Sequence, residues 1–176
     1  LKHWGTVVVA GGCYGIGSIY PIARALNEKG NRIISLIEGR SKFLLYWLDR
    51  LEAVSDRVLI STRDRSIGKN LDGPDALKDL VNSGERIDRV IAIGCTFMMY
   101  QMAEATRPFS VKTIVSLNPI MIDGTGMCGA CRVSVGGETK FACVDGPDFD
   151  GHQVDWDLLL ARRKAYLNPE TVSAER

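Results

Sequence analysis

The chain opens with a strand–turn–helix pattern that strongly restricts the folds it can form. The β-branched run Thr6–Ala10 predicts a buried strand, and the glycine-rich segment Gly11–Gly17 follows it directly. A helical pattern then continues to about Lys29 and ends at Gly30. Glycines at such a junction permit a tight turn and let backbone N–H groups approach an anion at the helix N-terminus. This opening predicts an α/β domain.

The same alternation repeats through the first two thirds of the chain. Four further strands are expected at Arg32–Ile37, Arg57–Ser61, Arg89–Ile93 and Val111–Leu117. The helices expected between them are one capped by Ser41 and running through Leu51, one opened by Pro74, and one over Phe97–Thr106. Because strands that alternate with helices imply right-handed crossovers, we expect a five-stranded parallel sheet with helices on both faces.

Composition and charge exclude several classes of partner. The 176 residues, 45% of them hydrophobic, suffice for one ordinary domain and a small appendage. The formal net charge of +1 gives no argument for nucleic acid or an anionic membrane surface. No apolar run is long enough to span a bilayer. Because the sequence has no initiating Met, we expect it to start inside a longer protein.

The pattern changes near residue 118, where we expect a boundary between a nucleotide-binding domain at 1–118 and a small module at 119–176. The second segment is rich in glycine and has few helix signals until its end. There, Trp156–Leu160 predicts a C-terminal helix, which Asn168 and Pro169 should end. A segment of this composition is expected to be organised by what it binds.

Three of the five cysteines, Cys128, Cys131 and Cys143, lie in this glycine-rich segment. A chain that can build its own core does not need disulfides, so we expect reduced thiols in a cytoplasmic protein. Cys128 and Cys131 flank a two-residue turn, and a hairpin with Gly136 and Gly137 at its tip would return Cys143 to them. Three clustered thiols predict a metal or iron–sulfur site.

Asp123 is the candidate for a fourth ligand. Plant-type ferredoxins use C-x₄-C-x₂-C…C, and Asp123 stands where the first Cys of that pattern would be. A carboxylate is a harder donor than a thiolate, so it should change the reduction potential. Alternatives stay open: structural zinc, three unligated thiols, Asp123 as an ordinary turn residue, or Asp145 or Asp148 as the fourth ligand.

Two strand ends resemble the ferredoxin–NADP reductase superfamily. The glycine-rich turn followed by Ile19–Ala23 is similar to the entry of its nucleotide domain, and Gly94–Met99 resembles its Gly-Cys-Gly-Pro-Met-Met turn, with Thr96-Phe97 replacing Gly-Pro. The resemblance implies a pyrophosphate on the first turn and a nicotinamide beside the second. The implied contacts are Gly11, Gly12, Cys13, Tyr14, Gly15, Ile16, Gly17, Gly94 and Cys95. From the residues alone, the turn could bind nothing and Cys95 could be a small buried hydrophobe.

The segments Leu117–Val133, Phe141–Pro147 and Phe149–Asp155 resemble a narrower group, the small subunits of sulfide dehydrogenase and of NADH-dependent reduced ferredoxin:NADP oxidoreductase. The electron-transfer subunit of dihydroorotate dehydrogenase is a near relative with Cys in place of Asp123, so Asp123 favours the first group. The resemblance implies FAD on an N-terminal barrel that we expect to precede Leu1. It also implies a larger flavin and [4Fe–4S] partner subunit, through which ferredoxin could be reached. The implied ligands of a [2Fe–2S] cluster are Asp123, Cys128, Cys131 and Cys143.

The activity implied by the resemblance is electron transfer between NAD(P)H, FAD and the cluster, which we expect to be incomplete in these residues alone. Glu38 ends a strand where an acidic residue can bind the ribose hydroxyls of NAD. Arg40, Arg63 and Arg65 could instead bind a 2′-phosphate, or be solvated surface charges. We favour NAD. The competing functions are a zinc-stabilised, non-enzymatic binding module and the dihydroorotate-linked subunit.

Overall fold

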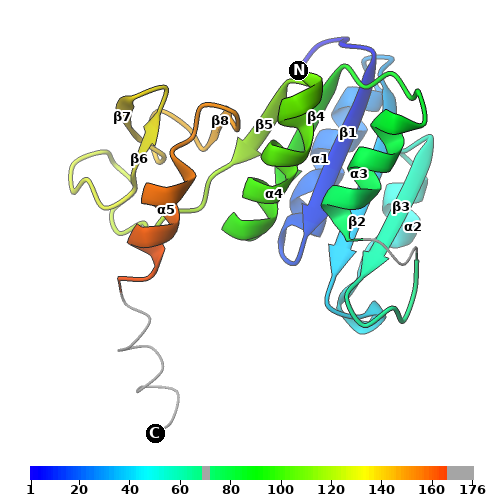
Figure 1. Ribbon diagram of the computed structural model, residues 1–176, viewed down its shortest axis with the longest axis horizontal. Coiled ribbons are helices and arrows are strands. Elements are labelled where there is room, and N and C mark those ends of the chain that lie inside the picture. The colour runs from blue at the N-terminus through cyan, green and yellow to red at the C-terminus, as the bar shows by residue number, and fades with distance from the viewer. Residues whose placement is uncertain (69–71, 166–176) are drawn as a thin grey trace, which may run out of the picture.

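The computed structural model describes residues 1–68 and 72–165, and its centre is a six-stranded sheet in the order β3-β2-β1-β4-β5-β8 (Figure 1). The strands are β1 (Thr6–Gly12), β2 (Arg32–Gly39), β3 (Arg57–Thr62), β4 (Arg89–Ile93), β5 (Thr113–Ser116) and β8 (Asp148–Asp150). The first five strands pair in parallel, which confirms the predicted α/β fold.

The sixth strand, β8, was not predicted and pairs antiparallel with β5. It has three residues, and its two aspartates are exposed, so it lacks the apolar run by which the other strands were found. Phe149 is the apolar residue of this strand, and it lies opposite the apolar Val115 of β5. The C-terminal part of the chain therefore returns to the edge of the six-stranded sheet.

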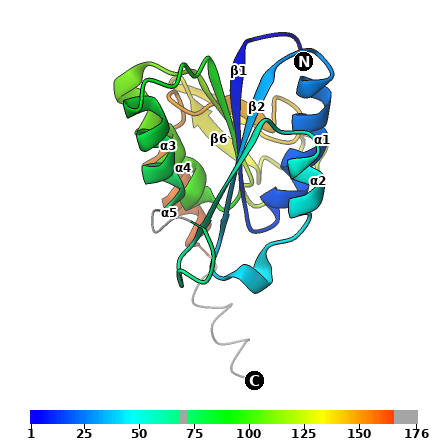
Figure 2. The same ribbon diagram turned by 90° about the vertical axis from the view of Figure 1, so that its right-hand side faces the viewer.

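Helices cover both faces of the sheet, as Figure 2 shows. One face carries α1 (Gly15–Asn27) and α2 (Leu48–Glu52); the other carries α3 (Gly73–Asn82) and α4 (Thr96–Thr106), which continues into the 3₁₀ turn η2 (Arg107–Phe109). Side chains of β1 enter the hydrophobic core on each face of the sheet: Val7 and Val9 pack toward α1, whereas Val8 and Ala10 pack toward α4. Because both faces are buried, each parallel strand here has a nearly continuous run of apolar residues in its sequence.

The predicted helix from Ser41 to Leu51 is wrong. A 3₁₀ turn, η1 (Lys42–Leu44), and the short helix α2 replace it, separated by Trp47 in the left-handed region at φ 57°. The Trp47 ring packs edge-to-face on Tyr20 of α1, with centroids 5.8 Å apart. These tertiary contacts outweigh a helical periodicity that is only local.

The cysteine-bearing segment forms the predicted hairpin, with β6 (Arg132–Val135) paired to β7 (Glu138–Phe141) in a separate sheet. The helix α5 (Trp156–Arg163) lies between this hairpin and α4 (Figure 1). Trp156 is buried, and its Nε1 donates to Gly151 O at 3.0 Å. The helix end expected at Asn168 and Pro169 lies outside the described residues, and a domain division at residue 118 stays a prediction.

None of the helices in residues 1–68 and 72–165 combines the length and the apolar composition that crossing a membrane requires.

Gly15 marks the place where the first turn of α1 meets the end of β4. A Cβ added at Gly15 would overlap the backbone oxygen of Ile93. We expect Gly15→Ala to lower the free energy of unfolding by about 1–3 kcal/mol, the usual cost of overpacking a core, in urea denaturation. Ser18→Ala, on the exposed side of the same helix, should change it by less than about 0.5 kcal/mol. Equal losses in both variants would contradict this close approach.

Candidate nucleotide cleft and cluster site

The carboxyl ends of β1 and β4 lie side by side, and the helices that follow them cover opposite faces of the sheet. Open α/β sheets bind ligands in the crevice that this reversal creates. Gly12 ends β1 and Gly94 follows β4; a Cβ on Gly94 would lie 3.1 Å from Gly12 O. The two glycine-containing turns predicted as nucleotide contacts are therefore brought together.

Tyr14 and Asn118 connect three strand ends at this crevice. The Tyr14 hydroxyl donates to Gly94 O at 2.6 Å and accepts from Asn118 Nδ2 at 2.7 Å. Thr96 Oγ1, at the start of α4, donates to Asn118 Oδ1 at 2.9 Å. Burial raises the pKa of Tyr14, and the nearby Arg163 charge partly opposes that rise. Asn118 was not among the predicted site residues, although its position just after β5 is equivalent to those of Gly12 and Gly94.

Tyr46 is a second residue that the sequence analysis missed. Its hydroxyl accepts from Gly17 N at 3.0 Å and lies 3.2 Å from Tyr14 O and 3.3 Å from Cys13 O. The first turn of α1 receives no side-chain cap from its own N-cap residue, so Tyr46 satisfies an amide there from another loop. An anion bound at this turn would compete with Tyr46 for the Gly17 N–H.

The remaining residues of the two turns occupy the positions that the sequence predicted. Gly11 ends β1 with Gly12, and Gly15 and Ile16 begin α1. Cys13 is exposed and has a left-handed backbone at φ 54°, whereas Cys95 is half-buried and precedes α4. Both thiols are near enough to the Tyr14 hydroxyl to influence its pKa.

A cavity of about 380 Å³ lies at the carboxyl ends of β2 and β3. Glu38 and Arg63 line it, with Arg63 Nη2 3.7 Å from Glu38 Oε1, whereas Arg40 is exposed and does not line it. The other lining residues are Ser61, Thr62, Arg65, Asp72, Phe97 and Gln101. An acidic and a basic predicted residue thus share one cavity, and Asp72, which also caps α3, adds a carboxylate that sequence reasoning missed.

Glu38 is only 7% exposed, and burial raises the pKa of its carboxyl. Arg63 and the Gly73 N–H oppose this rise, and the Asp72 charge adds to it. Glu38 Oε2 is buried, and no described residue forms a hydrogen bond of ordinary geometry with it. A buried carboxylate oxygen beside a cavity can accept a hydroxyl group from a ligand.

The hairpin brings two of the predicted metal ligands together. Cys131 precedes β6 and Cys143 follows β7, and an Ala142 N–H to Cys131 O bond of 3.2 Å extends the ladder between them. Their sulfur atoms are 3.3 Å apart, and Cys131 is 2% exposed. The hydrogen bond from Cys131 raises the pKa of Cys143. Two thiolates this close repel each other unless a cation lies with them, so the pair suits a metal centre.

The other two predicted ligands lie on the adjoining exposed loop. Both Asp123 oxygens accept backbone N–H groups, from Thr125 at 2.9 Å and Cys128 at 3.0 Å, and these bonds lower the pKa of Asp123. Cys128 Sγ accepts from Ala130 N at 3.4 Å. Across the described ranges, no three Cys, His, Asp or Glu side chains gather closely enough to hold a metal ion. The four-ligand set therefore stays a prediction.

Together, the sheet and the hairpin define a class by fold: a ferredoxin reductase-like, mostly parallel α/β sheet joined to a cysteine-bearing hairpin. Residues 118–155 match the family described as the iron–sulfur cluster binding domain of dihydroorotate dehydrogenase B. That range contains Asp123 and the three clustered cysteines, and it begins at Asn118 in the crevice.

Known relatives extend this likeness over the whole chain. An electron transfer subunit homolog of dihydroorotate dehydrogenase B (NAD(+)) from Thermotoga maritima is 47% identical over 176 residues, which are all of this chain and 62% of that protein. A probable subunit of the same kind from Methanocaldococcus jannaschii is 32% identical over 84% of this chain and 56% of its own length.

Among solved structures, that of the NADH-dependent reduced ferredoxin–NADP oxidoreductase, studied for flavin-based electron bifurcation, gives a TM-score of 0.86. It is 47% identical and covers 99% of this chain and 63% of that one. The chain thus spans less than two thirds of each of these three relatives. The resemblance inferred from the sequence is confirmed.

Glu38 gives a pH-dependent prediction for the ligand-free protein. Its folded pKa is raised, so the folded state loses stability as pH rises above the ordinary glutamate value of about 4.3. We expect Glu38→Gln to increase the free energy of unfolding at about pH 7, and the two proteins to converge near about pH 4, in urea titrations. Glu52→Gln, on the exposed side of α2, should leave stability unchanged at both pH values. A wild type more stable than Glu38→Gln at neutral pH would contradict the burial cost.

Proposed function

We propose that the chain is the nucleotide and [2Fe–2S] portion of an electron-transfer subunit in a cytoplasmic NAD(P)-dependent flavin and iron–sulfur oxidoreductase. The subunit would exchange electrons with NAD(P)H and with a larger flavin and [4Fe–4S] partner, and FAD would bind another part of the full-length protein. The observation that carries this proposal is the pair of Cys131 and Cys143 sulfurs, 3.3 Å apart in a segment that matches an iron–sulfur family.

Asp123, Cys128, Cys131 and Cys143 would hold the cluster. Thiolates are the usual donors of such clusters, and the C-x₂-C pair with a distant third Cys follows the ferredoxin-like spacing of a two-iron centre. Asp123 and Cys128 lie on an exposed loop that the Cys128 N–H to Asp123 bond holds, and this loop would have to close on the hairpin to complete the ligand set. When bound, the cluster supplies a one-electron carrier.

The dinucleotide would lie along the carboxyl ends of the strands. Backbone N–H groups of Gly12–Gly17 suit the pyrophosphate, Gly94 and Cys95 suit the nicotinamide, and Glu38 suits the adenosine ribose. Tyr46 would have to release the Gly17 N–H. We favour NAD over NADP because the Glu38 carboxylate would accept ribose hydroxyls and repel a 2′-phosphate, although Arg63 in the same cavity weakens that repulsion.

The electron-transfer subunit of dihydroorotate dehydrogenase is the second candidate. It is supported by the family that matches residues 118–155 and by the names of relatives from Thermotoga maritima and Methanocaldococcus jannaschii. Asp123 in place of a fourth cysteine favours the first candidate. Co-purification with an orotate-producing subunit would favour the second, and a colourless zinc protein would exclude both.

The test of the proposed function uses the full-length protein prepared without oxygen. We expect iron and inorganic sulfide in equal amounts, a brown colour that bleaches with dithionite, and an EPR signal in the reduced state. Cys131→Ser and Cys143→Ser should each lose most of the bound iron, because each removes one of two paired thiols. Cys13→Ser, whose thiol lies at the other site, should retain it. Wild-type protein without iron and sulfide would reject the function.

Asp123 is tested separately by its effect on the cluster spectrum. If Asp123 is a ligand, Asp123→Cys should shift the reduced-state EPR signal and lower the reduction potential, because thiolate donates more electron density than carboxylate. Asp145→Asn tests the alternative fourth ligand, since Asp145 accepts the Phe141 N–H at 2.6 Å and its amide analogue can still accept that bond. A spectrum unchanged by Asp123→Cys would assign the fourth ligand elsewhere.

A further inference from the structure

The last turn of α5 carries two consecutive arginines that reach in different directions. Arg162 Nη2 donates to Ala130 O at 3.1 Å, and Ala130 directly precedes Cys131 in the cluster loop. Arg163 Nη1 donates to Thr96 Oγ1 at 2.7 Å and to Asn118 Oδ1 at 3.1 Å, both at the nucleotide crevice. It also approaches Asn118 O at 3.3 Å. One helical turn therefore contacts both candidate sites.

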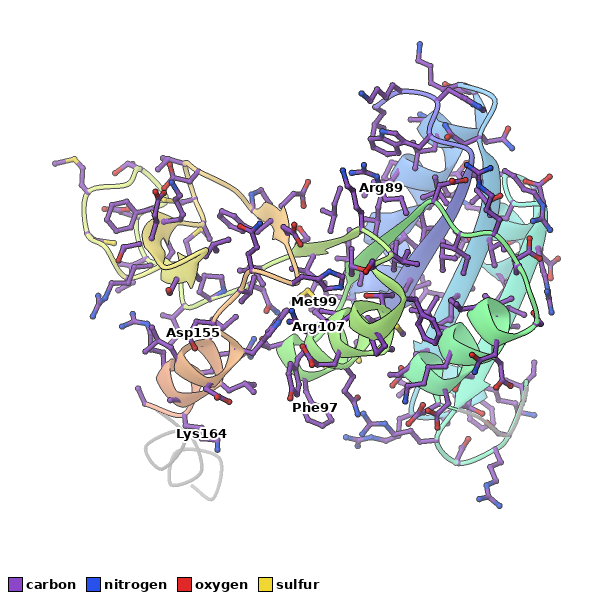
Figure 3. The ribbon with its side chains drawn as sticks, turned by 45° about the horizontal axis from the view of Figure 1, so that its top comes forward. Arg89, Phe97, Met99, Arg107, Asp155 and Lys164 are labelled. Carbon is purple, nitrogen blue, oxygen red and sulfur yellow. The ribbon has the colours of Figure 1, made fainter. Side chains whose placement is uncertain are left out.

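The helix that carries these arginines is held firmly at its other end. Leu159 and Trp156 are buried, the Trp156 ring lies 5.7 Å from that of Tyr100 in α4, and Asp155 caps the helix by accepting Leu158 N at 2.9 Å. Figure 3 shows Asp155 and Lys164 at the two ends of α5, between the hairpin and α4. The packing of α5 therefore fixes the backbone positions of the two arginines, although their side chains lie near the surface.

Among the residues that the structure describes, both guanidinium groups bond only to neutral oxygens. Within residues 1–68 and 72–165, no carboxylate lies within ion-pair distance of either arginine. A helix C-terminus favours cations in general, but this would apply equally to Lys164, which has no side-chain partner among the described residues. The helix dipole therefore does not explain why Arg162 contacts Ala130 and Arg163 contacts Thr96 and Asn118. Arg162 brings a positive charge, with no carboxylate partner in the described part of the chain, to the loop between Cys128 and Cys131.

We propose that Arg162 and Arg163 are positioning residues that clamp the cluster loop and the nucleotide crevice at a fixed separation through α5. The inference rests on the proposed function, because it assigns a role toward the cluster that function requires. A cation beside an iron–sulfur cluster stabilises its reduced, more negative form, so Arg162 would also raise the reduction potential of a cluster held by this loop. Arg163 holds Asn118, which in turn holds the Tyr14 hydroxyl at the crevice.

The experiment compares three variants that each remove one positive charge from the same turn of full-length protein. In EPR-monitored redox titrations, Arg162→Gln should lower the midpoint potential of the cluster, whereas Arg163→Gln and Lys164→Gln should leave it unchanged. Arg162→Lys keeps the charge and a donor, so it should restore the wild-type potential. In fluorescence titrations with NADH, Arg163→Gln should raise Kd on the order of tenfold, because Asn118 and the Tyr14 hydroxyl would lose the contact that positions them at the crevice.

The outcomes separate this inference from the proposed function. Equal potentials in Arg162→Gln and Lys164→Gln, with a cluster present in both, would overturn the inference and leave the function standing. So would an unchanged NADH affinity in Arg163→Gln. A folded Arg162→Gln that loses its cluster while Lys164→Gln retains it supports the clamp. Wild-type protein without iron and sulfide would overturn the function and the inference together.

Discussion

The pairing of β1 with β4 is the contact on which the rest of the molecule depends. Gly15 lets the first turn of α1 rest against the end of β4, and no side chain larger than hydrogen fits there. This approach puts Gly12 and Gly94 beside each other and within reach of Tyr14, whose hydroxyl spans the crevice. The crevice proposed for the nucleotide is thus a consequence of how two strands and one helix pack.

Both candidate sites contain groups that are unfavourable while no ligand is bound. Glu38 is a buried carboxyl with an oxygen that lacks a partner of ordinary geometry among the described residues, and its pKa is raised by burial. Cys131 and Cys143 place two sulfurs at 3.3 Å, which suppresses ionisation of Cys143. A fold selected for stability alone would replace such groups. Their presence at two separate places, the carboxyl ends of β2 and β3 and the β6–β7 hairpin, supports two binding functions.

The sequence predicted the elements whose signal is local and missed those set by distant contacts. Buried parallel strands read as apolar runs, and Gly136-Gly137 indicates a hairpin turn, so the five-stranded core and the β6–β7 pair were found. β8 is short and polar, and its pairing with β5 depends on the whole chain path. The Tyr14–Asn118 bond joins residues 104 apart, and only the fold brings them together.

The hairpin that bears the cysteines is joined to the main sheet and its helices at two points. β8 adds to the edge of the sheet beside β5, and α5 packs through Trp156 against Tyr100 of α4. A segment joined at one point can pivot, whereas two separated attachments, one made by backbone hydrogen bonds and one by aromatic packing, remove that freedom. The contacts of Arg162 and Arg163 then act across a junction that is already rigid, so they can set local distances. Electron exchange between two bound groups depends on this kind of fixed geometry more than on any single catalytic side chain.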